Sequence, residues 1–192
     1  MRGKPEETRK RILAAATKLF YANGIRAVGV DAIAAEAGIT KRTLYHHHES
    51  KDALIAAYLE AQNEPVLAAL IKSVTRVPGD VADQIEGLFT TFGRQAENAA
   101  WHGCPFARAV SELREFENDA VAGIAARHKR TFEEWLEGRF DDGGASEPDL
   151  LARQIMVLVD GAITQLLIHR DPSYATAAAA AAGVLIRQRL PD

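Results

Sequence analysis

The chain has 192 residues, 47% of them hydrophobic and 26% charged, which suits one compact domain or a small module joined to a larger one. Its longest run of small apolar residues, 175–186, is shorter than the about 20 residues that span a bilayer, so we expect no membrane partner. Basic residues near the N-terminus lack a following apolar stretch, which argues against a secretory signal. The single cysteine, Cys104, excludes an intrachain disulfide, and we expect a cytoplasmic protein.

Charge is unevenly distributed along the chain. Residues 1–51 contain ten Lys and Arg against five Asp and Glu, whereas residues 52–192 contain thirteen against twenty-one. A basic segment on an otherwise acidic chain favours contact with a polyanion. A chance excess of solvated basic side chains would give the same count, so charge alone does not decide between the two.

The first third of the chain predicts four helices. Apolar residues at three- and four-residue spacing over 12–20 mark the first helix, and Gly24 suits the left-handed position just past its end. Two short helices are predicted over 30–37 and 41–47. Thr40 can cap the second of these, and Ser50 can cap a fourth helix, because both side chains offer an oxygen to free backbone N–H groups.

Longer helices are predicted after Pro65, and no stretch alternates with a period of two for long, so the fold class is all-α. The breaks between these helices are rich in Gly, Pro or Asp. The predicted ranges are 80–97, 105–116, 119–140, 148–169 and 173–189.

Residues 29–48 have the pattern of a helix-turn-helix. Ile33 and Ala37 of the first helix and Leu44 of the second face inward, and Gly38 supplies the turn. In this motif the second helix enters the major groove of DNA with its N-terminal residues on the base edges.

The second helix of this motif has a polar outward face. With Leu44 inward, steps of 100° per residue place Arg42 and His46 on the opposite side, with Thr43 and Tyr45 beside them. Arg can read guanine with two hydrogen bonds, Thr can touch a base, and Tyr can bond a phosphate. The alternative is an ordinary amphipathic helix whose polar face meets only solvent.

Residues 8–58 resemble the TetR family of bacterial transcription regulators, through RILAAATKLFYANG followed by IAAEAGI, TLY and SKDAL. The resemblance implies an N-terminal helix-turn-helix DNA-binding domain over 1–52 and a C-terminal helical effector and dimerisation domain over 53–192. Residues 103–113, GCPFARAVSEL, also look like a segment of some such regulators. Base-edge positions implied by the resemblance are Thr40, Lys41, Arg42 and Thr43, and phosphate positions are Tyr45, His47 and Lys51.

The chain departs from the family pattern at two positions. Gly29 stands where the family usually has a capping Ser or Thr, and glycine offers no hydroxyl to a phosphate. His48 stands where the family usually has an aromatic residue.

Three consecutive histidines, His46, His47 and His48, cannot converge on one metal ion, because adjacent helical side chains diverge by about 100°. We predict that His46 faces DNA, His47 meets the DNA backbone at the flank, and His48 packs beside Leu44. Charging a buried His48 would then cost stability.

The C-terminal part has apolar stripes that fit a dimer seam of two helices from each of two chains. The same stripes would serve equally well inside one monomer. The predicted seam residues are Ile155, Leu158, Ala162, Leu166, Ala178, Ala182 and Leu185.

Aromatic residues gather between the predicted helices, where they form either the wall of a small-molecule pocket or a plain core. The resemblance favours a pocket, for which Phe92, Trp101 and Trp135 are the predicted contacts.

The leading hypothesis is therefore a homodimeric repressor that binds a pseudo-palindromic site on double-stranded DNA and is released by an unidentified small-molecule effector. No cofactor or metal is predicted. One alternative is a redox- or metal-responsive regulator that uses Cys104, because a thiol at a helix start is more reactive. Another is a helical enzyme, although the chain has none of the common catalytic motifs.

Overall fold

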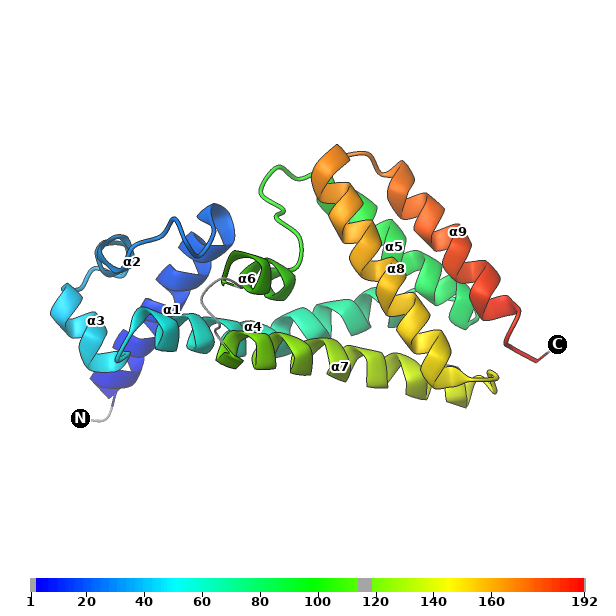
Figure 1. Cartoon of the computed structure of the whole chain (residues 1–192), viewed down its shortest axis with the longest axis horizontal. Helices are drawn as coiled ribbons and strands as arrows, with labels where there is room; N and C mark the ends of the chain where they lie inside the picture. Colours follow the sequence, from blue (N-terminus) through cyan, green and yellow to red (C-terminus); the bar gives the residue numbers. More distant parts are fainter. Residues whose placement is uncertain (1–2, 114–118, 192) are drawn as a thin grey trace. The chain divides into compact units, whose positions relative to one another are not determined.

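The structure, a computed structural model, describes residues 3–113 and 119–191. All the regular elements in these ranges are helices, which confirms the predicted all-α fold class (Figure 1). The helices are α1 (Gly3–Asn23), α2 (Val30–Glu36), α3 (Lys41–His47), α4 (Lys51–Thr75), α5 (Val81–Ala96), α6 (Pro105–Leu113), α7 (Asp119–Asp142), α8 (Pro148–His169) and α9 (Ser173–Arg187).

Local signals set most of these boundaries. Thr40 and Ser50 cap α3 and α4 as predicted, accepting from the N–H groups of Thr43 (3.1 Å) and Ala53 (3.0 Å). Three predicted residues of the sixth helix, 114–116, lie outside the described residues. Pro65 does not end α4, which continues to Thr75. Pro65 is exposed, so water reaches the side of the helix where the missing N–H leaves a carbonyl without a donor.

The chain divides into two compact units. Unit 1 comprises Met1–Pro65 and Cys104–Ala126, and unit 2 comprises Val66–Gly103 and Arg127–Asp192. Unit 1 thus holds α6 as well as the predicted 1–52 segment. The predicted functional boundary between residues 52 and 53 stays a prediction.

Unit 1 is built around side chains that α1, α4 and α6 bury together. Phe20 and Tyr58 lie with their ring centroids 5.4 Å apart, and Phe106 of α6 is fully buried. Burial of such apolar side chains is the main term that stabilises a helical unit of this size. The core of unit 1 also contains Ile12, Ala16, Ile33, Leu44, Leu54, Ile55 and Leu59.

Unit 2 is built from α5, α8 and α9, which pack on one another. A reciprocal capping box starts α5: Asp80 accepts from the N–H of Asp83 (2.9 Å), and Asp83 accepts from the N–H of Asp80 (3.3 Å). Of the described helices, α8 alone is long and apolar enough to cross a bilayer. Leu151, Ile155 and Leu166 on it are fully buried in unit 2, as in a core helix of a folded unit.

Candidate nucleic-acid interface

The turn between α2 and α3 is held by its own backbone and by a side chain of α1. Gly38 has a φ of +63°, in the left-handed region that favours glycine, and its N–H donates to the Ala35 carbonyl (3.0 Å). Arg11 on α1 donates to the carbonyls of Ala37 and Gly38. Carbonyls at the end of α2 that have no partner within the helix are thereby satisfied.

The inner face of the two short helices is apolar, as the sequence predicts. Ile33 and Leu44 are fully buried, and Ala34 and Ala37 are nearly so. Their burial fixes which side of α3 is turned away from the core.

Three of the four predicted base-edge residues make internal contacts at the start of α3. The hydroxyl oxygens of Thr40 and Thr43 lie 2.8 Å apart, and the Lys41 ammonium lies 3.1 Å from the Asp31 carboxylate. Both members of the Lys41–Asp31 pair are exposed, so a phosphate can compete for the lysine.

The outward face of α3 carries the residues that the sequence predicts there. Arg42 and His46 are exposed, and Tyr45 has 40% of its surface exposed. Thr43 and His47 are half-buried at its margins. This face offers donors of the types that bind guanine edges and phosphate oxygens.

The three histidines separate in the way that the sequence predicts. The rings of His46 and His47 meet edge to face, with centroids 5.6 Å apart. His48 is only 5% exposed, and within the described part of the chain its Nε2 has no hydrogen-bond partner. Burial lowers the pKa of His48, and the charges of Arg9 and His47 lower it further. Among residues 3–113 and 119–191, no group of three His, Cys, Asp or Glu side chains could hold a metal ion.

Lys51, at the first position of α4, is half-buried. Its Nζ donates to the Ile25 carbonyl at 2.8 Å. Burial lowers the pKa of Lys51, whereas Asp52 and Glu112 act in the opposite direction. An ammonium has three donors, so two remain for a phosphate.

The comparisons with known proteins agree with this geometry. The family model "Bacterial regulatory proteins, tetR family" matches residues 12–58, from α1 to the first part of α4. A protein of known crystal structure from Streptomyces avermitilis, described as a TetR transcriptional regulator, is 30% identical, with 91% of this chain and 97% of that chain covered and a TM-score of 0.75. The chain belongs to the TetR family.

Two further relatives support this assignment. A TetR-family transcriptional regulator from Streptomyces coelicolor is 26% identical, with 96% of each chain covered and a TM-score of 0.80. The transcriptional regulator UidR of Escherichia coli (strain K12) is 41% identical over 68 residues. That match covers 35% of this chain, and the chain spans only about a third (35%) of the length of UidR. All three relatives are described as transcriptional regulators, which agrees with the expectation that the chain is not an enzyme.

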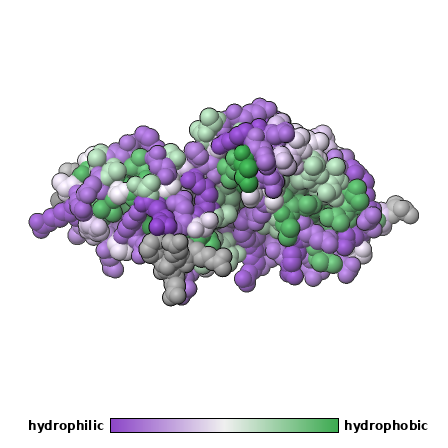
Figure 2. Space-filling view, turned by 45° about the horizontal axis from the view of Figure 1, so that its top comes forward, coloured by the Kyte–Doolittle hydropathy of each residue, from purple (hydrophilic) through white to green (hydrophobic). Residues whose placement is uncertain are grey.

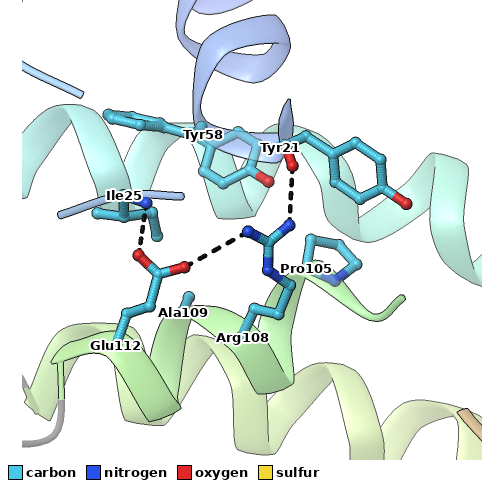
Figure 3. Close-up of a pocket in the computed structure, with 8 residues that line it drawn as sticks. Tyr21, Ile25, Tyr58, Pro105, Arg108, Ala109 and Glu112 are labelled. Carbon is cyan, nitrogen blue, oxygen red and sulfur yellow. Dashed lines mark hydrogen bonds and ion pairs between the residues drawn. The ribbon is translucent and has the colours of Figure 1, made fainter. Parts of the chain in front are cut away.

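The TetR signature residues leave out α6, which nevertheless contacts the end of α1 inside unit 1 (Figure 3). Arg108 donates to the Tyr21 carbonyl (2.8 Å), and one oxygen of Glu112 accepts from the N–H groups of Ile25 (2.6 Å) and Arg26 (3.0 Å). These contacts join residues about 87 positions apart, so no local pattern could reveal them.

A small cavity lies beside these contacts, with a volume of about 10 Å³. That volume holds about one water molecule and is far below the roughly 300 Å³ of a typical ligand pocket. Burial raises the pKa of Tyr58 in its wall to about 12, although Arg108 acts against this. The cavity is lined by Phe20, Tyr21, Ile25, Tyr58, Pro105, Arg108, Ala109 and Glu112.

The three aromatic residues predicted to contact an effector all lie in unit 2, and none lines that cavity. Phe92 is buried, with Phe89 edge to face at 6.3 Å. Trp135 is half-buried and stacks on Phe132 at 5.8 Å. Trp101 is half-buried, and its carbonyl accepts from Arg170 at 3.1 Å.

The predicted dimer residues lie largely inside unit 2. Ile155, Ala162, Leu166 and Ala182 are at most 4% exposed, so their side chains pack within one chain. This is the alternative that the sequence left open for such stripes. The remaining three, Leu158, Ala178 and Leu185, are half-buried.

The large apolar side chains that α8 and α9 do expose are not among the predicted dimer residues. Leu150, Val157 and Ile168 of α8 are 37%, 68% and 65% exposed, and Val184 of α9 is 55% exposed. Figure 2 shows hydrophobic patches on the surface of the part of the chain that forms unit 2. The three α8 residues are spaced by seven and eleven positions, which puts them on one side of a helix. We call these four residues the α8–α9 stripe.

Cys104 lies directly before α6 and is half-buried. A role for this thiol in a redox response stays a prediction.

Proposed function

We propose that this TetR-family protein binds double-stranded DNA sequence-specifically through α3. The observation that carries the proposal is the outward face of α3, on which Arg42, Tyr45 and His46 are exposed opposite the buried Leu44. A short helix presented in this way fits the major groove, and its N-terminal residues then reach the base edges. Lys51 and His47 at the margins suit phosphate contacts, which position a protein on the duplex.

Substitution of Arg42 tests this role. We expect Arg42→Ala to weaken binding by about 1–3 kcal/mol and to relax the preference for one base pair. Arg130→Ala, at an exposed position of α7 in unit 2, is the matched control and removes the same charge. Fluorescence anisotropy with a labelled duplex measures both variants. Equal losses in the two variants would mean that Arg42 contributes only general charge.

We also propose that the protein is a homodimer. The α8–α9 stripe, and not the predicted seam residues that are buried within one chain, would form the dimer interface. A single helix-turn-helix reads few bases, whereas a twofold dimer reads two half-sites of a pseudo-palindrome. Exposed valine and isoleucine side chains on neighbouring helices favour burial against a second copy. The half-buried Leu158, Ala178 and Leu185 would lie at the margin of such an interface.

The proposed regulation is repression in the cytoplasm that a small-molecule effector relieves. An effector must bind the released conformation more tightly than the DNA-bound one. Both tryptophans of the chain, Trp101 and Trp135, are in unit 2 and half-buried, so their fluorescence reports on the proposed effector unit alone. A compound that changes this fluorescence and also weakens DNA binding would support release. A compound that changes the fluorescence without affecting DNA binding would count against it.

A further inference from the structure

The backbone at residue 25 is held from both sides by charged side chains. Its N–H donates to Glu112 of α6 at 2.6 Å, and its carbonyl accepts from Lys51 of α4 at 2.8 Å. Hydrogen bonds with one charged partner are stronger than neutral ones. Ile25 itself is 3% exposed, so its side chain anchors this peptide in the core of unit 1.

The hydrogen bonds that the Glu112 carboxylate accepts also depend on the shape of the turn after α1. It bridges two successive N–H groups, those of Ile25 and Arg26, in the way that backbone N–H groups bind an anion. Gly24 precedes them with a φ of +85°, and a Cβ at this position would lie 3.0 Å from a Glu112 oxygen. The left-handed φ favours glycine at position 24, and a Cβ there would also press against the Glu112 carboxylate.

Arg108 holds Glu112 in place. The two residues are one helical turn apart on α6, with Nη2 and Oε1 separated by 3.7 Å, and their side chains are 27% and 24% exposed. Arg108 also donates to the Tyr21 carbonyl, one of the last carbonyls of α1. The spacing of four residues on α6 thus matches the spacing of four between Tyr21 and Ile25 (Figure 3).

We propose that Glu112 is a positioning residue for DNA binding, which fixes Lys51 through the Ile25 peptide and so makes phosphate contact depend on the position of α6. The inference rests on the proposed DNA-binding function. A shift of α6 removes the acceptor from the Ile25 and Arg26 N–H groups, the turn relaxes, and Lys51 loses the carbonyl that orients it. Neither Arg108 nor Glu112 needs to touch DNA for this effect.

A double-mutant cycle on Glu112 and Lys51 tests the proposal. DNA affinity is measured at several salt concentrations for the wild type, Glu112→Ala, Lys51→Ala and the double variant. Lys51→Ala should lower the slope of log K against log salt by about 0.9, the value for one phosphate contact. Glu112→Ala should lower it by a similar amount and weaken binding about fivefold or more. The double variant should bind no more weakly than Lys51→Ala.

Two further variants separate positioning from folding. Glu112→Gln keeps an acceptor for both N–H groups and should retain most of the wild-type affinity, even if Glu112→Ala unfolds. Glu133→Ala removes a carboxylate of similar exposure (27%) that pairs with Arg153 in unit 2, and it should leave the salt slope unchanged. Hydrogen exchange at the Ile25 and Arg26 amides should be faster in Glu112→Ala than in Glu112→Gln.

The outcomes distinguish a failure of the proposed DNA-binding function from a failure of the proposed coupling between Glu112 and Lys51. If the wild type binds no DNA, the proposed function fails. If the wild type binds but the effects of Glu112→Ala and Lys51→Ala multiply independently, the coupling is wrong while the function stands. An unchanged salt slope in a folded Glu112→Ala variant would overturn the coupling in the same way.

Discussion

Gly29 stands at the N-cap of α2, where the family usually has a serine or a threonine. It caps α2 with φ −83° and ψ 156°, makes no side-chain cap hydrogen bond, and has no atom within 4 Å of the place where a Cβ would lie. Any residue can adopt this backbone conformation without strain. We expect Gly29→Ser to raise the free energy of unfolding by about 0.5 kcal/mol, because the chain becomes less flexible when unfolded and the cap gains a hydroxyl.

Gly29→Ala is the control for that substitution in chemical denaturation. It shares the change in chain flexibility but lacks the hydroxyl, and it should be about 1 kcal/mol less stable than Gly29→Ser. Equal stabilities of the two variants would show that the hydroxyl does not cap α2.

His48 makes unit 1 sensitive to acid. Its folded-state pKa is lowered from 6.5, mainly by burial, so the neutral form is favoured in the folded protein. Its stability contribution is therefore complete above about pH 6.5 and is lost as the pH falls below that value. We expect His48→Phe to lose less stability than the wild type between pH 7.5 and pH 5.5 in thermal unfolding.

His46→Gln, at an exposed position of the same helix, controls for a general effect on α3. The same acid loss in His48→Phe and the wild type would contradict the burial of a neutral His48.

His128 should have a larger effect on unit 2. It is 2% exposed, and burial lowers its pKa to about 4, with Lys129 acting in the same direction and Asp160 against it. As with His48, a lowered pKa means that acid destabilises the folded protein. The free energy of unfolding should fall by about 3 kcal/mol for this shift as the pH drops from about 6.5 to 4. We expect His128→Gln to remove most of that loss in denaturant titrations at pH 7 and pH 4.5. An undiminished loss in the variant would assign the acid sensitivity to other groups.

At the scale of elements, short-range signals predicted the helices well. The bounds of α3 and α8 agree with the predicted 41–47 and 148–169 because Thr40, Gly38 and the Gly- and Pro-rich breaks act within a few residues. The inner and outer faces of α3 were predictable for a similar reason, since a seven-residue helix with one buried leucine has only one core side.

The sequence could not predict which face of α8 is buried and which is exposed. Apolar residues surround α8 on several sides, so the sequence cannot tell whether Ile155 or Val157 meets the core. Tertiary packing, and not the sequence of α8, decides that Ile155 is buried and Val157 is exposed. The contact between Glu112 and Ile25 was likewise hidden, because it joins distant parts of the chain.

The proposed role of the α8–α9 stripe as a dimer interface can be tested at Val157. We expect Val157→Asp to convert a dimer into a monomer of 20.9 kDa in sedimentation equilibrium, because the carboxylate would be buried in the interface without a partner. Ala126→Asp, at an exposed position of α7, should leave the mass unchanged. Circular dichroism checks that both variants keep their helices. A Val157→Asp variant that remains dimeric would exclude this face as the interface.

In the whole molecule, a basic helix-turn-helix segment is joined to a helical unit that is proposed to dimerise and bind an effector. Dimerisation and DNA binding are then linked, because two half-sites contribute to affinity only when both copies are joined. Variants that dissociate the dimer should therefore weaken binding to a full site far more than binding to a half-site.

Sequence-specific DNA binding through α3 is tested by a fluorescence-anisotropy titration of the purified protein. The titration uses DNA from upstream of its own gene and a scrambled fragment, each at two salt concentrations. We predict tight binding that prefers the native fragment and weakens steeply with salt, as phosphate contacts combined with base readout require. Equal affinity for the two fragments would contradict sequence-specific binding at this site. No binding to either would contradict the assignment of α3 as the recognition helix.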